Sequence, residues 1–277
     1  MGRRGTETEF ELTTIDRLEA LGYAHTVGTE IDRSHEEVVF AGDLEAFLRS
    51  NYPELPPESR QFAINRLVRP QGVDSLHRNM DFHLLCTRGF EVPIDQEDGC
   101  RRHVHVHPIA WDAPMSNNFR VVNQLPIRGS NDRRPDIIIY VNGLPLVLFE
   151  LKNPWEPNFT VEHAHNQVSH YRHDISQIFE FNALTVISDG VTTLHGQWPA
   201  SFEWFAPWKS IDGVNVEANT TGSMKTLIEG LFPKDRLLAY IRDFVLFEEV
   251  NDEITKKAAK YHQFLSLIHI SEPTRPY

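Results

Sequence analysis

Hydrophobic residues recur near the start of the chain at intervals of five, three and three positions, at Phe10, Ile15, Leu18 and Leu21. This spacing places them on one face of a helix, and the Gly22 that follows is a common helix terminator. We therefore predict a helix over residues 8–21. Residues 24–98 then mix polar helical segments with proline-rich breaks, which predicts a mostly helical insertion.

The pattern changes to strands from about Gly99. The segment RRHVHVHPIAW alternates polar and apolar residues, and the segment NFRVVNQLPI follows it. Two aliphatic runs, Ile137–Val141 and Leu144–Phe149, flank Asn142-Gly143, a dipeptide that favours a hairpin turn. Because both runs are apolar on both faces, we place this hairpin in the interior of a sheet.

Helical and extended patterns continue to alternate after the hairpin. We expect, in order, a helix over Val161–Phe181, a buried strand at Ala183–Ser188, short strand or loop pieces at Thr192–Gln197 and Glu203–Trp208, and helices at Lys225–Leu231 and Lys234–Phe247. This order predicts an α/β fold, in which helices flank a mixed β-sheet.

Composition narrows the class of protein. The chain has 277 residues, 40% of them hydrophobic and 24% charged, and no apolar run approaches the roughly 20 residues that span a bilayer. Its two cysteines, Cys86 and Cys100, lack a metal-binding spacing, so we expect a cytoplasmic protein. The net charge of −12 argues against binding nucleic acid over the whole surface. Between Arg120 and Lys152, however, five positive residues outnumber three negative ones, which suits local phosphate binding.

Charged side chains border the predicted hairpin. Asp136 precedes its first run, Glu150 follows its second run, and Lys152 comes two residues later. Mg²⁺ prefers oxygen ligands, so the carboxylates of Asp136 and Glu150 and the backbone carbonyl of Leu151 could hold this ion. Lys152 could orient or help deprotonate an attacking water and stabilise charge on a phosphate. We therefore predict a site for metal-dependent phosphodiester hydrolysis; the alternative is a solvated ion pair at a strand end.

The hairpin register sets a geometric condition for this site. A strict two-residue turn would place Asp136 opposite Phe149, so that Glu150 would point to the other face of the sheet. A shared metal needs both carboxylates on one side. We therefore predict either a three-residue turn with a bulge, or a bulge or bend in the strand at Asp136.

Further residues could support the site. Gln167 and Tyr171 lie four apart on a predicted helix and are neighbours on its surface, although a boundary Gln beside a core Tyr would give the same pattern. Arg133 and Arg134 precede the metal motif and could contact a phosphate backbone or lie in a solvated loop. Three histidines alternate on a predicted strand, His103, His105 and His107. Because no further ligand has a suitable spacing, we favour an exposed polar strand face over a zinc site.

These motifs together resemble a known family. The run FRVVNQLPIRGSNDRRPDIIIYVNGLPLVLFELKNP resembles the nuclease motif region of the R subunits of type I restriction enzymes. The segment QVSHY is similar to the QxxxY motif of RecB-like nucleases in the PD-(D/E)xK superfamily. The likeness extends over most of residues 8–264, and includes EFELTTIDRLEALGY, VISDG and LIEGLFPKDRLLAYIRDFVLFE.

The resemblance implies a restriction-endonuclease-like core and Mg²⁺-dependent cleavage of double-stranded DNA. It implies that Asp136, Glu150 and Lys152 form the catalytic triad, and that Gln167 and Tyr171 form the accessory motif.

The same resemblance implies that the first helix contributes an acidic residue to the site and that the protein has partner subunits. Glu11 matches the acidic position of the first helix that can approach the metal, and Glu9 is a nearby competitor. The family also implies ATP-driven translocation and assembly with modification (M) and specificity (S) subunits.

The likeness divides the chain into three segments. We expect residues 1–250 to form the nuclease domain and residues 251–264, with KKAAKYHQF, to begin a helicase motor. Residues 265–277 are typical of read-through into a sequencing adapter, so we expect them to lie outside the fold. No GxxxxGK[ST] phosphate loop occurs, and we therefore do not expect this chain to bind ATP. The alternatives are a stand-alone RecB-like nuclease and a non-catalytic docking module for the modification complex.

Overall fold

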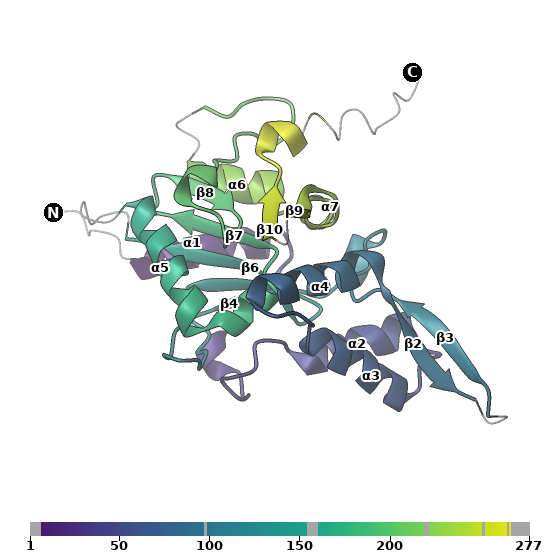
Figure 1. The fold of residues 1–277 in the computed structure, drawn as a ribbon. Coiled ribbons are helices and arrows are strands. Elements are labelled where there is room, and N and C mark those ends of the chain that lie inside the picture. Colours follow the sequence, from purple (N-terminus) through teal and green to yellow (C-terminus); the bar gives the residue numbers. More distant parts are fainter. Residues whose placement is uncertain are drawn as a thin grey trace, which may run out of the picture. The chain divides into compact units, whose positions relative to one another are not determined.

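A six-stranded mixed β-sheet forms the centre of the fold (Figure 1). The computed structural model describes residues 7–96, 99–153, 160–218, 222–250, 253–264 and 266. The strand order is β1-β4-β5-β6-β7-β8. The strands are β1 (Ala24–Val27), β4 (Phe119–Asn123), β5 (Ile137–Val141), β6 (Leu144–Leu151), β7 (Leu184–Ser188) and β8 (Thr193–Gly196). β1 runs parallel to β4, whereas β4 with β5 and β7 with β8 are antiparallel. The sheet and its flanking helices confirm the predicted α/β class and agree with a restriction-endonuclease-like core.

The chain divides into two compact units. The first unit comprises Met1–Tyr23, Phe149–Ser169 and Leu184–Tyr277, and the second comprises Ala24–Leu148 and His170–Ala183. Strand β6 and helix α5 (Val161–Asp174) each run from one unit into the other. The second unit therefore supplies β1, β4, β5 and most of β6, and the first unit supplies the end of β6 with β7 and β8.

Three helices and strand β2 occupy most of the predicted insertion, within the second unit, and β3, which follows the insertion, pairs with β2. They are α2 (Ala41–Asn51), α3 (Pro57–Val68), α4 (Ser75–Arg88), β2 (Phe90–Asp95) and β3 (Arg101–Val106). α2 packs on α3, α3 packs on β2, and α4 packs on a short 3₁₀ helix, η3 (Ser176–Glu180). The start of the predicted insertion is wrong, because Ala24–Val27 pairs with β4 as a strand of the central sheet. Four residues are too few to show a strand period in the sequence.

The other helices and a second hairpin belong to the first unit. They are α1 (Glu7–Ala20), α6 (Ser223–Leu231), α7 (Lys234–Phe244), β9 (Val245–Val250) and β10 (Glu253–Ala258). Further 3₁₀ turns are η1 (Gly28–Glu30) and η2 (Pro114–Ser116) in the second unit and η4 (Phe202–Trp204) in the first. α1 ends before Gly22, whose φ of +83° confirms the predicted glycine stop.

Two predicted helices end earlier than the periodicity indicated. The helix expected over 234–247 stops at Phe244, because Val245 is already extended and begins β9. The helix expected over 161–181 stops at Asp174, and η3 follows after Ile175, which has φ −134° and ψ 51°. In both cases the apolar spacing continues past the point where the backbone leaves the helical region, so periodicity alone does not mark the end.

The hairpin between β5 and β6 has a tight, buried turn. Asn142 and Gly143 both have positive φ, +52° and +82°, as a two-residue turn of type I′ requires. The Asn142 side chain is fully buried, donates to the carbonyl of Pro108 and accepts from the amide of Asn118. A β-carbon at Gly143 would overlap the carbonyl oxygen of Phe40. Of the two alternatives predicted for the hairpin register, the three-residue turn is therefore wrong.

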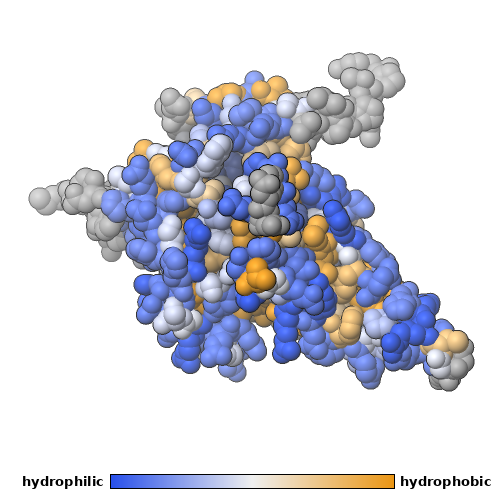
Figure 2. Space-filling model, viewed as in Figure 1, coloured by the Kyte–Doolittle hydropathy of each residue, from blue (hydrophilic) through white to orange (hydrophobic). Residues whose placement is uncertain are grey.

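Polar residues dominate the face of the molecule seen in Figure 2, with apolar residues scattered between them. Exposed apolar side chains include Val73, Met115 and Val214. Within the described ranges, no helix combines the length and the apolar character needed to cross a membrane.

Candidate active site

Glu150 and Lys152 form a largely buried ion pair at the end of β6, in the first unit. The Lys152 Nζ lies 2.6 Å from Oε1 of Glu150, and the two side chains are 16% and 3% exposed. The backbone amide of Lys152 donates to the carbonyl of Ser188 at 2.8 Å, which fixes this segment beside β7. The ion pair agrees with the prediction, from the alternation of side chains, that residues 150 and 152 share a face. Burying a carboxylate is costly unless a counter-charge or metal compensates it, and Lys152 provides that charge.

Asp136 lies in the second unit, in a bend directly before β5 rather than within the strand. It is 7% exposed. The Gln124 amide donates to the Asp136 carbonyl at 3.0 Å, and the Gln124 side-chain amide donates to Oδ1 at 3.2 Å. Gln124 itself has a φ of +50°, which is uncommon for a residue with a side chain. The predicted bend at Asp136 is thus confirmed, and the alternation of the β5 pleat does not fix the direction of this carboxylate.

Helix α5 carries the two accessory residues. Tyr171 is 4% exposed, and its carbonyl accepts from the amide of Ile175 at 2.9 Å. Gln167 is half-buried. Ala164 and Val168, on the same helix, are fully buried. A core position and a role beside the metal are both compatible with Tyr171.

The two arginines that precede Asp136 have different surroundings. The Arg133 guanidinium is bound by Asp174, with Nε 2.7 Å and Nη2 2.5 Å from Oδ2. Asn131 donates to the other carboxylate oxygen of Asp174 at 2.6 Å. The hydrogen bond from Asn131, followed by that from Arg133, holds the pKa of Asp174 below its usual value. Arg134, by contrast, is exposed.

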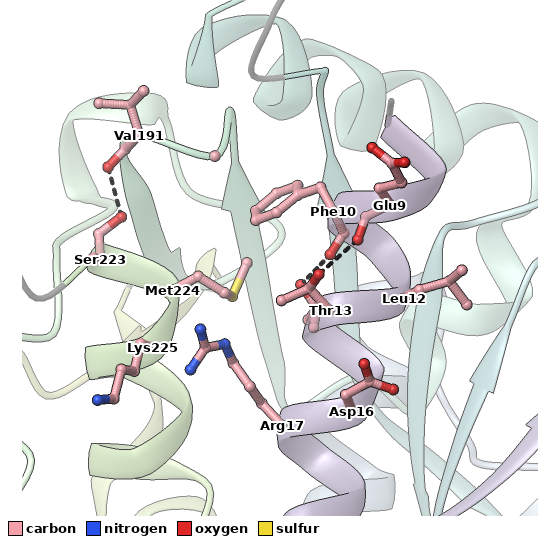
Figure 3. Close-up of a pocket in the computed structure, with 13 residues that line it drawn as sticks. Glu9, Phe10, Leu12, Thr13, Asp16, Arg17, Val191, Ser223, Met224 and Lys225 are labelled. Atoms are coloured by element: carbon pink, nitrogen blue, oxygen red, sulfur yellow. Dashed lines mark hydrogen bonds between the residues drawn. The ribbon is translucent and has the colours of Figure 1, made fainter. Parts of the chain in front are cut away.

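The two glutamates of α1 have different surroundings. Glu11 is 5% exposed and shares the buried face of the helix with Ile15 and Leu18. Glu9 is exposed and borders an open groove of about 840 Å³ between α1 and the start of α6 (Figure 3). Of the two competitors, Glu11 therefore has the partly desolvated position that a carboxylate near a metal commonly has.

The groove in Figure 3 has a mixed lining. Thr13 donates to the carbonyl of Glu9 at 2.8 Å, and on the opposite wall Ser223 donates to the carbonyl of Val191 at 2.7 Å. Its lining holds two acidic and two basic side chains, since α1 contributes Glu9, Asp16 and Arg17 and α6 contributes Lys225. This balance of charge gives the groove no preference for an anion or a cation.

The alternating histidines have different surroundings, since His103 and His105 are exposed on β3 whereas His107 follows the strand and is half-buried. On β3, His105 Nδ1 lies 2.9 Å from Oε1 of Glu91, and Nε2 lies 2.8 Å from the carbonyl oxygen of Arg88. The Glu91 hydrogen bond, followed by the Arg88 contact, raises the pKa of His105. Among the residues that the structure describes, no group of three or more His, Cys, Asp or Glu side chains is arranged to hold a metal. The structure therefore adds nothing in favour of a zinc site.

The donor set of the predicted metal site suits a hard cation. Asp136 and Glu150 offer carboxylate oxygens and Leu151 a backbone carbonyl, which are the ligand types that Mg²⁺ prefers. That these residues bind one shared ion stays a prediction, as do the roles of Gln167 and Tyr171.

Sequence reasoning missed two residues that contact the site segments. Gln124 bonds directly to Asp136, and Asp174 holds Arg133 and Asn131. A polar residue after a strand and an aspartate at a helix end are common, and neither belongs to a motif, so the sequence held no signal for these contacts.

Comparison with known proteins identifies similar chains. The family model for the type I restriction enzyme R protein N terminus matches residues 6–204. The chain is 35% identical over 272 residues to the type I restriction enzyme HindI endonuclease subunit of Haemophilus influenzae, covering 93% of this chain and 26% of that protein. It is 25% identical over 283 residues to the putative type I restriction enzyme MjaIXP endonuclease subunit of Methanocaldococcus jannaschii, covering 93% of this chain and 26% of that protein. The chain thus spans about a quarter of the length of these relatives.

Proposed function

Because the chain belongs to the family of type I restriction enzyme R proteins, whose N-terminal part it matches, we propose that it is the DNA-cleaving part of such an enzyme. Its reaction is the Mg²⁺-dependent hydrolysis of phosphodiester bonds in double-stranded DNA. This proposal agrees with the names of both relatives, which are called endonuclease subunits.

The observation that carries the proposal is the buried pair of Glu150 and Lys152. A buried ion pair adds little net stability, because the desolvation of two charges opposes their attraction. Yet this pair lies at the end of β6, a strand whose residues are all buried. Its stability alone gives no reason for such a costly placement, whereas a carboxylate for a metal beside a cation for a phosphate gives one.

Each residue has a distinct role in the proposed reaction. Asp136, Glu150 and the carbonyl of Leu151 would hold Mg²⁺, and the bound ion would polarise a phosphoryl oxygen and lower the pKa of water. Lys152 hydrogen-bonds the attacking water and neutralises charge that develops on the phosphate. Arg134, the exposed arginine, contacts the phosphate backbone of the DNA.

Three further residues support these groups. Glu11, on the buried face of α1, would approach the bound metal as an additional carboxylate, although no three acidic or histidine side chains are prearranged for a metal among the described residues. Gln167 and Tyr171 position the metal ligands from helix α5. In the full-length protein, ATP-driven translocation and assembly with M and S subunits are also proposed, by analogy with the type I enzymes to which the chain is similar.

Plasmid cleavage tests the proposal. Supercoiled DNA is incubated with the chain in Mg²⁺ or in EDTA, and nicked and linear products are measured over time. Asp136→Asn, Glu150→Gln and Lys152→Ala should each lower the rate by about 10²–10³-fold, because each removes a group that stabilises the transition state. EDTA should abolish cleavage.

Matched substitutions at exposed ion pairs provide the controls. Asp132 pairs with Arg128 at 3.8 Å and has a side chain 71% exposed, so Asp132→Asn controls for Asp136→Asn. Lys225 pairs with Glu229 at 3.9 Å and is 40% exposed, so Lys225→Ala controls for Lys152→Ala. Cleavage at the wild-type rate by all three site variants would overturn the assignment. Calorimetry that detects no Mg²⁺ binding by the wild type would instead favour the docking module.

A further inference from the structure

The loop that carries Asp136, residues 124–136, is closed at its base. Gln124 begins this Asp136 loop and donates both its backbone amide and its side-chain amide to Asp136, at 3.0 and 3.2 Å. The loop therefore leaves β4 and returns to β5 at the residue that the proposed function uses as a metal ligand.

A second pair of hydrogen bonds stiffens the loop above its base. The amide of Ile127 donates to the carbonyl of Arg133 at 2.8 Å, and the amide of Arg133 donates back at 2.9 Å. Only two residues then separate Arg133 from Asp136, and the second of them is Pro135, whose ring fixes one backbone torsion. Because this connection is short and restricted, a displacement of the backbone at Arg133 also displaces the backbone at Asp136.

The outer part of the Asp136 loop is anchored on the end of helix α5. Asp174 accepts from Asn131 with one carboxylate oxygen and from Arg133 with the other. Ser130 donates to the carbonyl of His173 at 3.0 Å. Gly129 lies so close to the Asp174 carbonyl oxygen that a β-carbon there would overlap it. The Asp174 side chain is only 10% exposed, so bulk water cannot readily replace these partners.

The anchoring point lies one helical turn beyond Tyr171, the accessory residue of the proposed site. Residues three apart on a helix are neighbours, so Asp174 and Tyr171 occupy the same side of α5. The contact at Asp174 thus joins the segment that supplies a metal ligand to the helix that supplies the accessory motif.

We infer that Asp174 is a positioning residue, which through Arg133 and Asn131 fixes the Asp136 carboxylate relative to helix α5. The inference rests on the proposed function, because it takes Asp136 as a ligand of Mg²⁺. This ion demands near-octahedral geometry, and metal ligands must be held within about 0.5 Å of their productive positions. Asp136 lies just before β5, where its bonds with Gln124 close the base of the loop, and the anchor at Asp174 adds to this precision.

Asp174→Asn tests the inference, because it retains the shape of the side chain and removes its charge. The rate of plasmid cleavage is measured against Mg²⁺ concentration, and Mg²⁺ binding is measured by calorimetry without DNA. We expect the half-saturating Mg²⁺ concentration and the dissociation constant to rise by about 10–100-fold, the usual effect of losing a group that orients a metal ligand. The rate at saturating Mg²⁺ should stay close to the wild-type rate, which a general loss of structure would not allow.

Two more variants keep the test decisive if Asp174→Asn folds poorly. Asn131→Ala removes one exposed partner of Asp174 and should raise both Mg²⁺ constants in the same direction by a smaller factor. Arg133→Lys keeps the positive charge, so it should bind Mg²⁺ more tightly than a variant that has a neutral residue at position 133. Asp132→Asn, in the same loop and 71% exposed, should bind Mg²⁺ as the wild type does.

The outcomes separate the inference from the proposed function. If Asp136→Asn loses Mg²⁺ binding but Asp174→Asn and Asn131→Ala bind it as the wild type does, the inference is wrong and the proposed function stands. If Asp136→Asn itself binds Mg²⁺ normally, the proposed function is wrong.

Discussion

Lys152→Met isolates the electrostatic state of the candidate site. Methionine keeps the length of the lysine stem and removes the charge that lies 2.6 Å from Oε1 of Glu150. Since the Glu150 side chain is only 3% exposed, water cannot easily replace the ammonium group. The variant should therefore be destabilised by an uncompensated buried carboxylate.

The structure allows an estimate of this destabilisation. Two unit charges at the observed separation attract by about 6 kcal/mol at an effective dielectric constant of about 20. Desolvation opposes this attraction by several kcal/mol for each ion, so the pair contributes little net stability. Removing only Lys152 leaves the desolvation of Glu150 in place, and we expect a loss of about 3–5 kcal/mol in the free energy of unfolding. Removing both charges, with Glu150→Gln added, should recover most of that loss.

Urea unfolding in EDTA at neutral pH measures these free energies for the wild type, the single variant and the double variant. The control is Lys225→Met, which breaks an exposed ion pair and should cost less than about 1 kcal/mol. Excess Mg²⁺ should raise the stability of Lys152→Met and leave the double variant unchanged, because only the former retains the carboxylate. A double variant as unstable as the single one would refute the reasoning, since the loss would then come from packing rather than from charge.

Two further predictions concern the folded state. Burial lowers the pKa of His195 from 6.5 to about 4, so unfolding takes up a proton between these values, and acidification over this range should cost about 3 kcal/mol. Urea unfolding measures the free energy of unfolding of the wild type and of His195→Phe as the pH falls. An equal loss of stability in both proteins over this pH range would contradict the prediction. Gly129→Ala should destabilise the chain by about 1–3 kcal/mol, because its β-carbon would overlap the carbonyl of Asp174. Gly42→Ala, on a helix with open space around it, should be neutral or stabilising in the same urea assay.

The hairpin could be predicted from the sequence because its determinants are local. Aliphatic runs on both sides of Asn142-Gly143 specify two buried strands and the turn between them, and the structure shows both. The alternation of side chains along β6 then places Glu150 and Lys152 on one face without any further information. The same logic explains the correct prediction of helix α1 with its glycine stop.

The errors arise where distant contacts decide the local structure. β1 is too short to show a period, and it is a strand because β4 pairs with it. In the sequence, the register of a two-residue turn places the two carboxylates on opposite faces of the sheet, which argues for a three-residue turn. The structure instead bends the chain at Asp136, with Gln124 in a left-handed conformation opposite it. No local pattern around either residue distinguishes this solution from a regular ladder.

The two carboxylates of the candidate site are therefore held by different means, and this difference makes the proposals separable. Glu150 is fixed by the pleat of a buried strand and by its pairing with Lys152, so a change at Lys152 should appear first as a loss of stability. Asp136 is fixed by a loop whose anchor, Asp174, lies at the end of a helix, so a change at Asp174 should appear first as weaker Mg²⁺ binding. If both changes affected stability and metal affinity in the same proportion, the loop would be only part of the general fold. If the change at Lys152 instead mainly lowers stability and the change at Asp174 mainly weakens Mg²⁺ binding, then the sheet holds Glu150 rigidly and the loop sets how well Asp136 fits the metal.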